Sequence, residues 1–114
     1  MEFTTTLKKN YEFHRLYHKG KSAVTPFLVV YARGSKRPGM RIGITVSTRL
    51  GKAVKRNRVR RRLREIYRLN ESRVVPGTEL VVVARARAVT ATYRQLEAAF
   101  LSASERLGLL SEAK

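Results

Sequence analysis

The chain has 114 residues, with 25 Lys and Arg against 8 acidic residues, a formal net charge of +17. This length predicts a single domain over residues 1–114, with residues 1–6 and 111–114 as flexible ends. The absence of Cys excludes disulfides, thiolate zinc sites and cysteine nucleophiles. No apolar run is long enough to cross a bilayer, and the first residues do not resemble a signal peptide, so we expect a cytoplasmic protein without a membrane partner.

The excess of basic residues indicates a polyanionic partner, because such a chain repels itself unless its charge is neutralised. Of the 25 basic residues, 17 are Arg, whose planar guanidinium binds phosphate through two hydrogen bonds and stacks on bases. A membrane surface would instead require a basic helix with a bulky apolar face left free. Nucleic acid is therefore the favoured partner.

The first half of the chain predicts one helix and three strands. Aromatic and apolar residues at helical spacing predict a helix over Tyr11–Lys19. A short strand at Lys21–Val24 precedes a clear strand at Phe27–Arg33, and residues 34–39 predict a hairpin loop before a strand at Met40–Ser47. The expected apolar faces are Leu28, Val30 and Ala32 on one strand and Ile42, Ile44 and Val46 on the next, with Phe27, Val29 and Tyr31 opposite the first set.

The second half predicts a long helix, a strand and a last helix. The long helix covers about Ala53–Leu69, and the nearly continuous apolar run Leu80–Ala84 predicts a central strand covered on both sides. The last helix begins near Thr92, which fits a capping box with Gln95, and Gly108 is expected to end it. Helices on the faces of a small mixed sheet make an α+β sandwich.

The long helix is unusually basic, since residues 49–68 contain ten basic residues and one acid, Glu65. At about 100° per residue its apolar residues form one stripe, which we expect to be buried. An ordinary solvated face would pair opposite charges, whereas here like charges lie four residues apart and destabilise the isolated helix. The pattern therefore favours polyanion binding. The expected anchors are Val59, Leu63, Ile66 and Tyr67, and the expected contacts are Lys52, Lys55, Arg56, Asn57, Arg58, Arg60, Arg61, Arg62, Arg64 and Arg68.

The stretch RIGITVSTRLGKAVKRNRVRRRLREIYR, residues 41–68, resembles the signature of the bacterial ribonuclease P protein subunit, with Arg56-Asn57-Arg58 as its RNR motif. Residues 10–20 (NYEFHRLYHKG) and 78–85 (TELVVVAR) are similar to the family's first helix and last strand, so the resemblance covers most of the chain. It implies a small αβββαβα two-layer sandwich of the ribosomal-protein-like kind. It also implies a mixed sheet and a left-handed βαβ crossover through the basic helix, against the usual preference for right-handed crossovers.

The resemblance further implies a subunit of an endoribonuclease whose chemistry is carried by its RNA subunit. The protein would bind ribonuclease P RNA and the 5′ leader of precursor tRNA, and would assist the Mg²⁺-dependent removal of that leader. Mg²⁺ would be bound mainly by the RNA, and no small-molecule substrate is expected. The leader would lie in a cleft between the first helix and the sheet, lined by Phe13, Tyr17, Tyr31 and Ser47.

Pattern alone leaves other interpretations of these residues open. Aromatic residues at helical or alternating spacing usually fill cores, although unpaired bases also stack on such rings. Phe27 is a weaker candidate for the cleft, and Tyr93 and Phe100 are assigned to the core. Arg41 and Thr45 would face the cleft or would be ordinary surface residues.

Two further functions stay in view, a ribosomal-type protein that clamps folded rRNA and an intrinsic metal-dependent nuclease. A metal-dependent nuclease needs several carboxylates together, whereas Asp is absent and the Glu residues do not cluster. His14 and His18 have a spacing that could ligate a metal, but no third ligand is evident nearby. We therefore predict no catalytic residue and no metal site on the protein alone.

Overall fold

The computed structural model describes residues 4–7, 10–34 and 40–110. These described residues form three helices and five strands, with short 3₁₀ turns between some of them. In chain order the helices and strands are β1 (Thr4–Thr6), α1 (Asn10–Lys19), β2 (Lys21–Val24), β3 (Leu28–Gly34), β4 (Met40–Thr45), α2 (Ala53–Asn70), β5 (Thr78–Ala84) and α3 (Tyr93–Arg106). The 3₁₀ turns are η1 (Thr48–Leu50), η2 (Glu71–Arg73) and η3 (Ala86–Val89).

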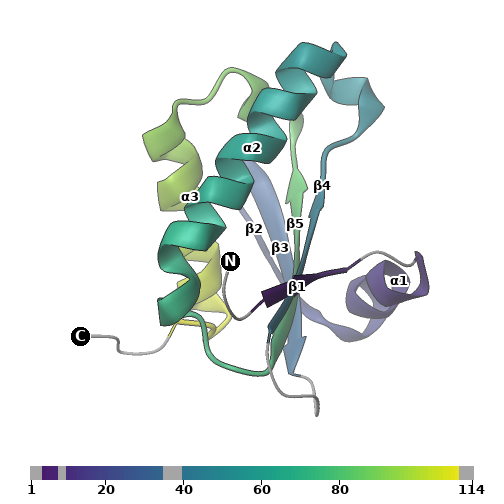
Figure 1. Cartoon of the computed structure of the whole chain (residues 1–114), viewed down its shortest axis with the longest axis vertical. Helices are drawn as coiled ribbons and strands as arrows, with labels where there is room; N and C mark the ends of the chain where they lie inside the picture. Colours follow the sequence, from purple (N-terminus) through teal and green to yellow (C-terminus); the bar gives the residue numbers. More distant parts are fainter. Residues whose placement is uncertain (1–3, 8–9, 35–39, 111–114) are drawn as a thin grey trace.

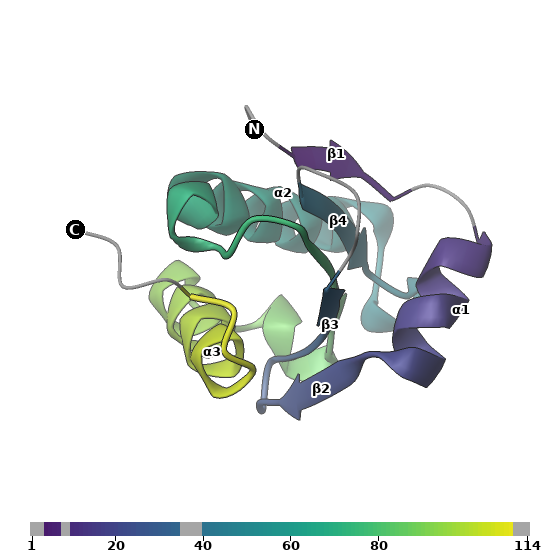
Figure 2. The same ribbon diagram turned by 90° about the horizontal axis from the view of Figure 1, so that it is seen from below.

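The strands form one mixed sheet in the order β1-β4-β5-β3-β2. Strand β3 is antiparallel to both β2 and β5, whereas β4 is parallel to both β1 and β5. Helices α2 and α3 cover one face of this sheet, and α1 covers the other (Figures 1 and 2). The expected α+β class and mixed sheet are confirmed. No helix among the described residues is both long and apolar enough to span a membrane.

The crossover from β4 through α2 to β5 joins two neighbouring parallel strands. Viewed from the side of α2 with both strands pointing up, β5 lies to the left of β4, so that the crossover is left-handed (Figures 1 and 2). This hand agrees with the expectation from the family resemblance. The basic helix α2 follows β4 after the short turn η1, and the face of β4 opposite to α2 looks toward α1 (Figure 2).

Two apolar clusters hold the layers together. The larger one lies between the sheet and the α2–α3 layer and contains Leu80, Val82 and Ile66. The smaller one lies under α1 and contains Leu16 and Val81. Because neighbouring residues of β5 enter opposite clusters, β5 is buried on both faces, which confirms the central strand predicted from its continuous apolar run.

Several boundaries differ from the predicted ones by one or two residues, β5 for example starting at Thr78 rather than Leu80, and three differences have a visible structural cause. Residues 1–6 were expected to be a flexible end, but Thr4–Thr6 pairs in parallel with β4 and covers its edge. The strand expected from Phe27 starts at Leu28, because the Thr25 hydroxyl bonds the backbone of Leu28 and closes a turn ahead of it. The strand expected to reach Ser47 ends at Thr45, because Ser47 caps η1. The expected ends 1–3 and 111–114, and loop residues 35–39, lie outside the described residues.

The long helix and the last helix form as their sequences predict. The α2 stripe of four apolar anchors is buried, and the helix runs one residue beyond the expected end. The Thr92 side chain accepts a hydrogen bond from the Gln95 amide, and the Gln95 side chain accepts one from the Thr92 amide, which completes the capping box of α3. Gly108 then adopts a φ of 71°, the left-handed conformation that ends a helix.

Candidate nucleic-acid interface

The basic side chains of α2 lie on the surface because its apolar stripe fixes which way the helix rotates. Val59, Leu63 and Ile66 are each at most 3% exposed, so the opposite side of the helix faces solvent. Three of the predicted contacts are partly exposed, namely Arg56, Arg60 and Arg62. The other seven are exposed, namely Lys52, Lys55, Asn57, Arg58, Arg61, Arg64 and Arg68.

Most of these cations are free to bind a ligand. Five of them make no side-chain hydrogen bond or ion pair with any described residue, namely Lys52, Lys55, Arg58, Arg61 and Arg64. Three others donate single hydrogen bonds inside the protein, Arg56 to the Gly51 carbonyl at 3.1 Å, Arg60 to Asn57 at 3.0 Å and Arg62 to the Ala91 carbonyl at 3.1 Å. Each of these guanidiniums keeps further N–H donors for a partner.

Arg68 is the exception, because it is paired within its own helix. Its guanidinium donates hydrogen bonds to both carboxylate oxygens of Glu65, at 3.0 and 2.7 Å. This hydrogen bonding lowers the pKa of the Glu65 carboxyl and raises the pKa of Arg68. Arg68 therefore contributes less free charge to the basic face than its position in the sequence suggests.

The start of α2 adds to the positive potential. Its N-cap is Lys52, which makes no side-chain capping bond, and the first turn contains no acidic residue. Unsatisfied amides at a helix N-terminus carry a partial positive charge that a carboxylate or a phosphate normally offsets. Here the nearest side chains are themselves cationic, so the whole N-terminal part of α2 attracts anions.

An aromatic cluster lies on the other side of the sheet, where α1 crosses it. The Tyr17 and Tyr31 rings meet edge to face, with centroids 4.9 Å apart. Tyr17 is 37% exposed, whereas Tyr31 is half-buried against the smaller core. The structure therefore brings together two of the predicted cleft residues, with Tyr17 the more open of the two.

Phe13 is closely packed rather than open. Its ring lies directly on the backbone of Gly43, so close that a Cβ atom at Gly43 would stand 2.6 Å from Phe13 Cε1. It also packs against the cluster formed by Leu7, Leu16 and Val81. Phe13 thus packs between α1 and the sheet, so the interpretation of these aromatic residues as core residues fits Phe13 better than it fits Tyr17.

Two other cleft candidates lie elsewhere. Phe27 precedes β3 and packs on the larger core of the opposite face, with the Arg87 guanidinium 5.4 Å from its ring centroid. Ser47 follows β4 at the end of the sheet where α2 begins, and its Oγ accepts a hydrogen bond from the Arg49 amide at 3.1 Å (Figure 1). Alternation along a strand does not reveal this turn, and the assignment of Ser47 to the leader site stays a prediction.

Arg41 is committed to the protein rather than to a ligand. Its guanidinium bridges Glu12 of α1 and Glu79 of β5, with Arg41 Nη1 3.7 Å from Glu79 Oε2. Both carboxylates are buried, 5% and 4% exposed. This bridge ties α1 to the sheet beside the aromatic cluster. The sequence placed Arg41 on the correct face, but nothing in the pattern showed that two acids would meet it there.

The two histidines of α1 do not form a metal site with other described residues. The His14 and His18 rings stack with centroids 6.2 Å apart, and both side chains are exposed. No group of three His, Cys, Asp or Glu side chains suited to a metal occurs within residues 4–7, 10–34 and 40–110. The buried Glu12 and Glu79 are already paired with Arg41.

Comparison with known proteins finds a consistent set of relatives. Residues 1–108 match the sequence profile of the Ribonuclease P family. The chain is 36% identical to the ribonuclease P protein component of Alkaliphilus metalliredigens over 97% of this chain and 100% of that protein. It is 41% identical to the one from Clostridioides difficile, over 85% and 88%. A Staphylococcus aureus RNase P protein mutant, described as defective in mRNA degradation activity, superposes with a TM-score of 0.85 at 32% identity, covering 92% of this chain and 89% of that one.

Proposed function

The chain belongs to the ribonuclease P protein family, and we propose from its geometry how it serves this tRNA-processing endoribonuclease as the partner of ribonuclease P RNA. The exposed face of α2 binds the phosphates of the RNA subunit. The aromatic cluster under α1 binds the 5′ leader of precursor tRNA. The RNA subunit carries the chemistry and binds the Mg²⁺ that it requires.

The observation that carries this proposal is the set of cations on α2 that have no hydrogen bond or ion pair with another described residue. A helix held by four buried anchors fixes the backbone from which the guanidiniums extend, so no backbone entropy is lost when they bind phosphate. Five of the ten basic or amide side chains have no partner among the described residues. A face used only for solubility would mix acidic residues with its basic ones, whereas residues 49–68 contain ten basic residues and Glu65 as their one acid.

The aromatic cluster supports the assignment of the leader. Single-stranded nucleic acids bind rings with little sequence preference, and each stacked base contributes about 1–3 kcal/mol. Tyr17 is 37% exposed and can stack with such a base, and its contact with Tyr31 restricts its orientation. A site of this kind suits a leader whose sequence differs from one precursor tRNA to another.

The acidic residues support the assignment of the chemistry to RNA. A two-metal hydrolytic site needs several free carboxylates at one place. Within the described residues the buried Glu12 and Glu79 share ion pairs with Arg41, the buried Glu71 also has a partner, and Glu65 is paired with Arg68 on the same helix. Glu12 and Glu79 therefore fit the structural role of holding α1 against the sheet better than they fit a protein-borne Mg²⁺ site.

A reconstitution experiment tests the proposal. Precursor tRNA would be incubated at low Mg²⁺ with the RNA subunit alone, with the protein alone, and with both, and cleavage at the 5′ leader would be measured. The holoenzyme should cleave faster than the RNA alone, and the protein alone should not cleave. The variant Arg61→Gln/Arg64→Gln should lose most of the stimulation, whereas Arg94→Gln, an exposed arginine on α3, should retain it.

Each contrary result points to a different alternative. No stimulation by the wild-type protein would mean that it does not act through this RNA. Cleavage by the protein alone would place a nuclease on the protein, and an mRNA substrate should be included because of the activity described for the Staphylococcus aureus relative. Equal losses for the double variant and for Arg94→Gln would show that net charge, rather than the α2 face, matters.

A further inference from the structure

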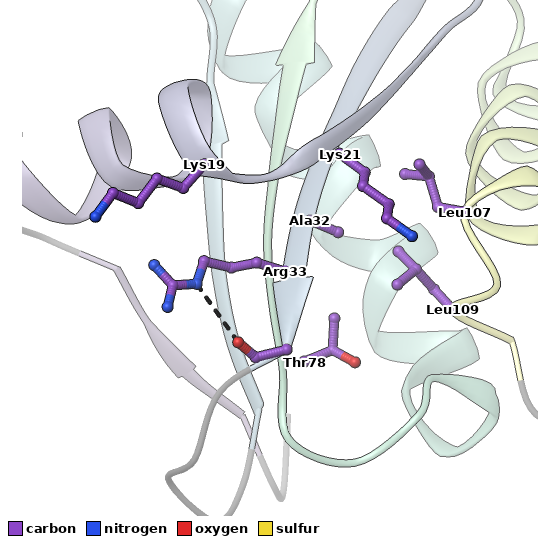
Figure 3. Close-up of a pocket in the computed structure, with 8 residues that line it drawn as sticks. Lys19, Lys21, Ala32, Arg33, Thr78, Leu107 and Leu109 are labelled. Atoms are coloured by element: carbon purple, nitrogen blue, oxygen red, sulfur yellow. Dashed lines mark hydrogen bonds between the residues drawn. The ribbon is translucent and has the colours of Figure 1, made fainter.

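A second cationic site lies at the end of β3, away from the start of α2. A cavity of about 270 Å³ opens there between the ends of β2, β3 and β5 and the chain after α3. Three of its lining residues are cations, Lys19, Lys21 and Arg33, and only one of its lining residues, Thr78, carries a neutral polar side chain (Figure 3). The concentration of positive charge around a cavity is the first indication of an anionic ligand.

The guanidinium of Arg33 is incompletely paired inside the protein. Its Nε donates to the neighbouring Gly34 carbonyl at 3.4 Å and lies 3.9 Å from Glu79 Oε1, both at the outer limit for such contacts. Its Nη1 is buried without a hydrogen-bond partner among the described residues. Since a buried N–H group without an acceptor is unfavourable, the geometry indicates an acceptor supplied by a ligand.

Arg33 and Lys19 project to the same side of the sheet. Figure 3 shows both charged groups on the α1 side of β3, whereas Lys21 projects to the other side, beside Leu107 and Leu109. Lys19 alone has an ordinary explanation, because a cation in the last turn of α1 stabilises the carbonyl end of the helix. The incompletely paired Arg33 has no such explanation, and it is the residue that indicates a site.

The position of this pair relates it to the aromatic cluster. Arg33 lies two residues beyond Tyr31 on the same face of β3, a separation of about 6.6 Å along a strand. Lys19 lies in the last turn of α1, about half a turn around the helix from Tyr17, and lines the same cavity as Arg33. A single strand that stacks a base on the Tyr17–Tyr31 pair and continues along β3 therefore brings its sugar-phosphate backbone to Arg33 and to the cavity that Lys19 also lines.

We propose that Arg33 and Lys19 form a phosphate site that holds one phosphodiester of the single strand whose base stacks on Tyr17 and Tyr31. This inference rests on the proposed binding of the leader by the aromatic cluster and extends it to the backbone of the leader. The site would set the direction and depth of the strand, while the rings accept any base. It is separate from the α2 face, which binds the RNA subunit.

The test uses the reconstituted holoenzyme and two forms of one precursor tRNA, with a long leader and with a leader of one nucleotide. Affinity is measured over a range of salt for wild type, Arg33→Gln, Lys19→Gln and the control Arg94→Gln. Each phosphate contact to a single strand contributes about 0.7 to the slope of log affinity against log salt. We expect Arg33→Gln and Lys19→Gln each to reduce the slope by about that amount for the long leader only, and Arg94→Gln to leave it unchanged.

Three results would overturn the inference, and they separate it from the proposed function. If wild type already binds both forms equally, the proposed leader contact itself fails. If wild type distinguishes them but neither variant changes the slope, the leader contact stands and the phosphate site is wrong. The third result would come from inorganic phosphate added to the free protein. If phosphate raises the melting temperature of wild type but not of Arg33→Gln, while neither variant changes the salt slope for the long leader, the site binds free phosphate instead of the leader. Lys19→Gln keeps the test valid if Arg33→Gln perturbs folding, since Lys19 makes no described contact with Glu79.

Discussion

Arginine side chains have three different roles in this chain, and the surroundings of each side chain determine its role. Arg61 is exposed and has no partner within the described part of the chain, Arg68 is paired with Glu65 on the surface, and Arg41 is held between two buried carboxylates. The sequence predicted the first of these roles from helical periodicity, because an anchor stripe determines the opposite face. It could not predict the third, because Glu12, Arg41 and Glu79 come from three separate elements.

At the same scale, Tyr17 should contribute to leader binding without contributing much to stability. Replacing it by Ala removes an exposed ring, so we expect precursor tRNA affinity to fall by about 1–3 kcal/mol, while mature tRNA affinity stays the same. Filter binding with both RNAs measures the difference. Tyr11→Ala is the matched control, since its ring is 58% exposed on the same helix outside the cluster. Equal losses for the two RNAs would remove Tyr17 from the leader site.

The elements follow their local sequence well except where partners distant in sequence decide the outcome. Helices α2 and α3 end within one or two residues of their predicted limits, since caps, glycine and periodicity are local signals. Strand β1 has only three residues, Thr4–Thr6, and it forms because β4 offers an open edge. The position of α1 depends in turn on the bridge from Glu12 to Arg41 and on the small size of Gly43 beneath Phe13.

Arg41 should therefore matter for stability more than any exposed arginine. Arg41→Met leaves Glu12 and Glu79 buried without their shared cation, and breaking a buried pair in this way costs about 3–5 kcal/mol. Urea unfolding at neutral pH measures this loss in the free energy of unfolding. The triple variant Glu12→Gln/Arg41→Met/Glu79→Gln should recover part of it. A loss no larger than that of Arg94→Gln would mean that the bridge does not hold α1 in place.

On the scale of the whole molecule, the fold places the two proposed interfaces, the basic face of α2 and the aromatic cluster of Tyr17 and Tyr31, on opposite faces of the sheet. The left-handed crossover puts α2 on one face of the sheet, while the strand just before it, β4, forms part of the floor under α1 on the other face (Figure 2). Residue patterns do not specify the hand of a crossover, so this arrangement was accessible only through the family resemblance. The result is a basic helix and an aromatic cluster on opposite sides of one sheet, which is the arrangement that the proposed contacts with two RNAs require.

The salt dependence of binding to ribonuclease P RNA tests most directly whether the open face of α2 is the RNA interface. Affinities would be measured at several salt concentrations for wild type, Arg61→Gln, Arg68→Gln and Arg94→Gln. Because each phosphate contact adds about 0.7–0.9 to the slope of log affinity against log salt, Arg61→Gln should reduce the slope by that amount. Arg68→Gln should reduce it less, since Glu65 already holds that guanidinium, and Arg94→Gln should not change it. Identical slopes for wild type and Arg61→Gln would contradict the account.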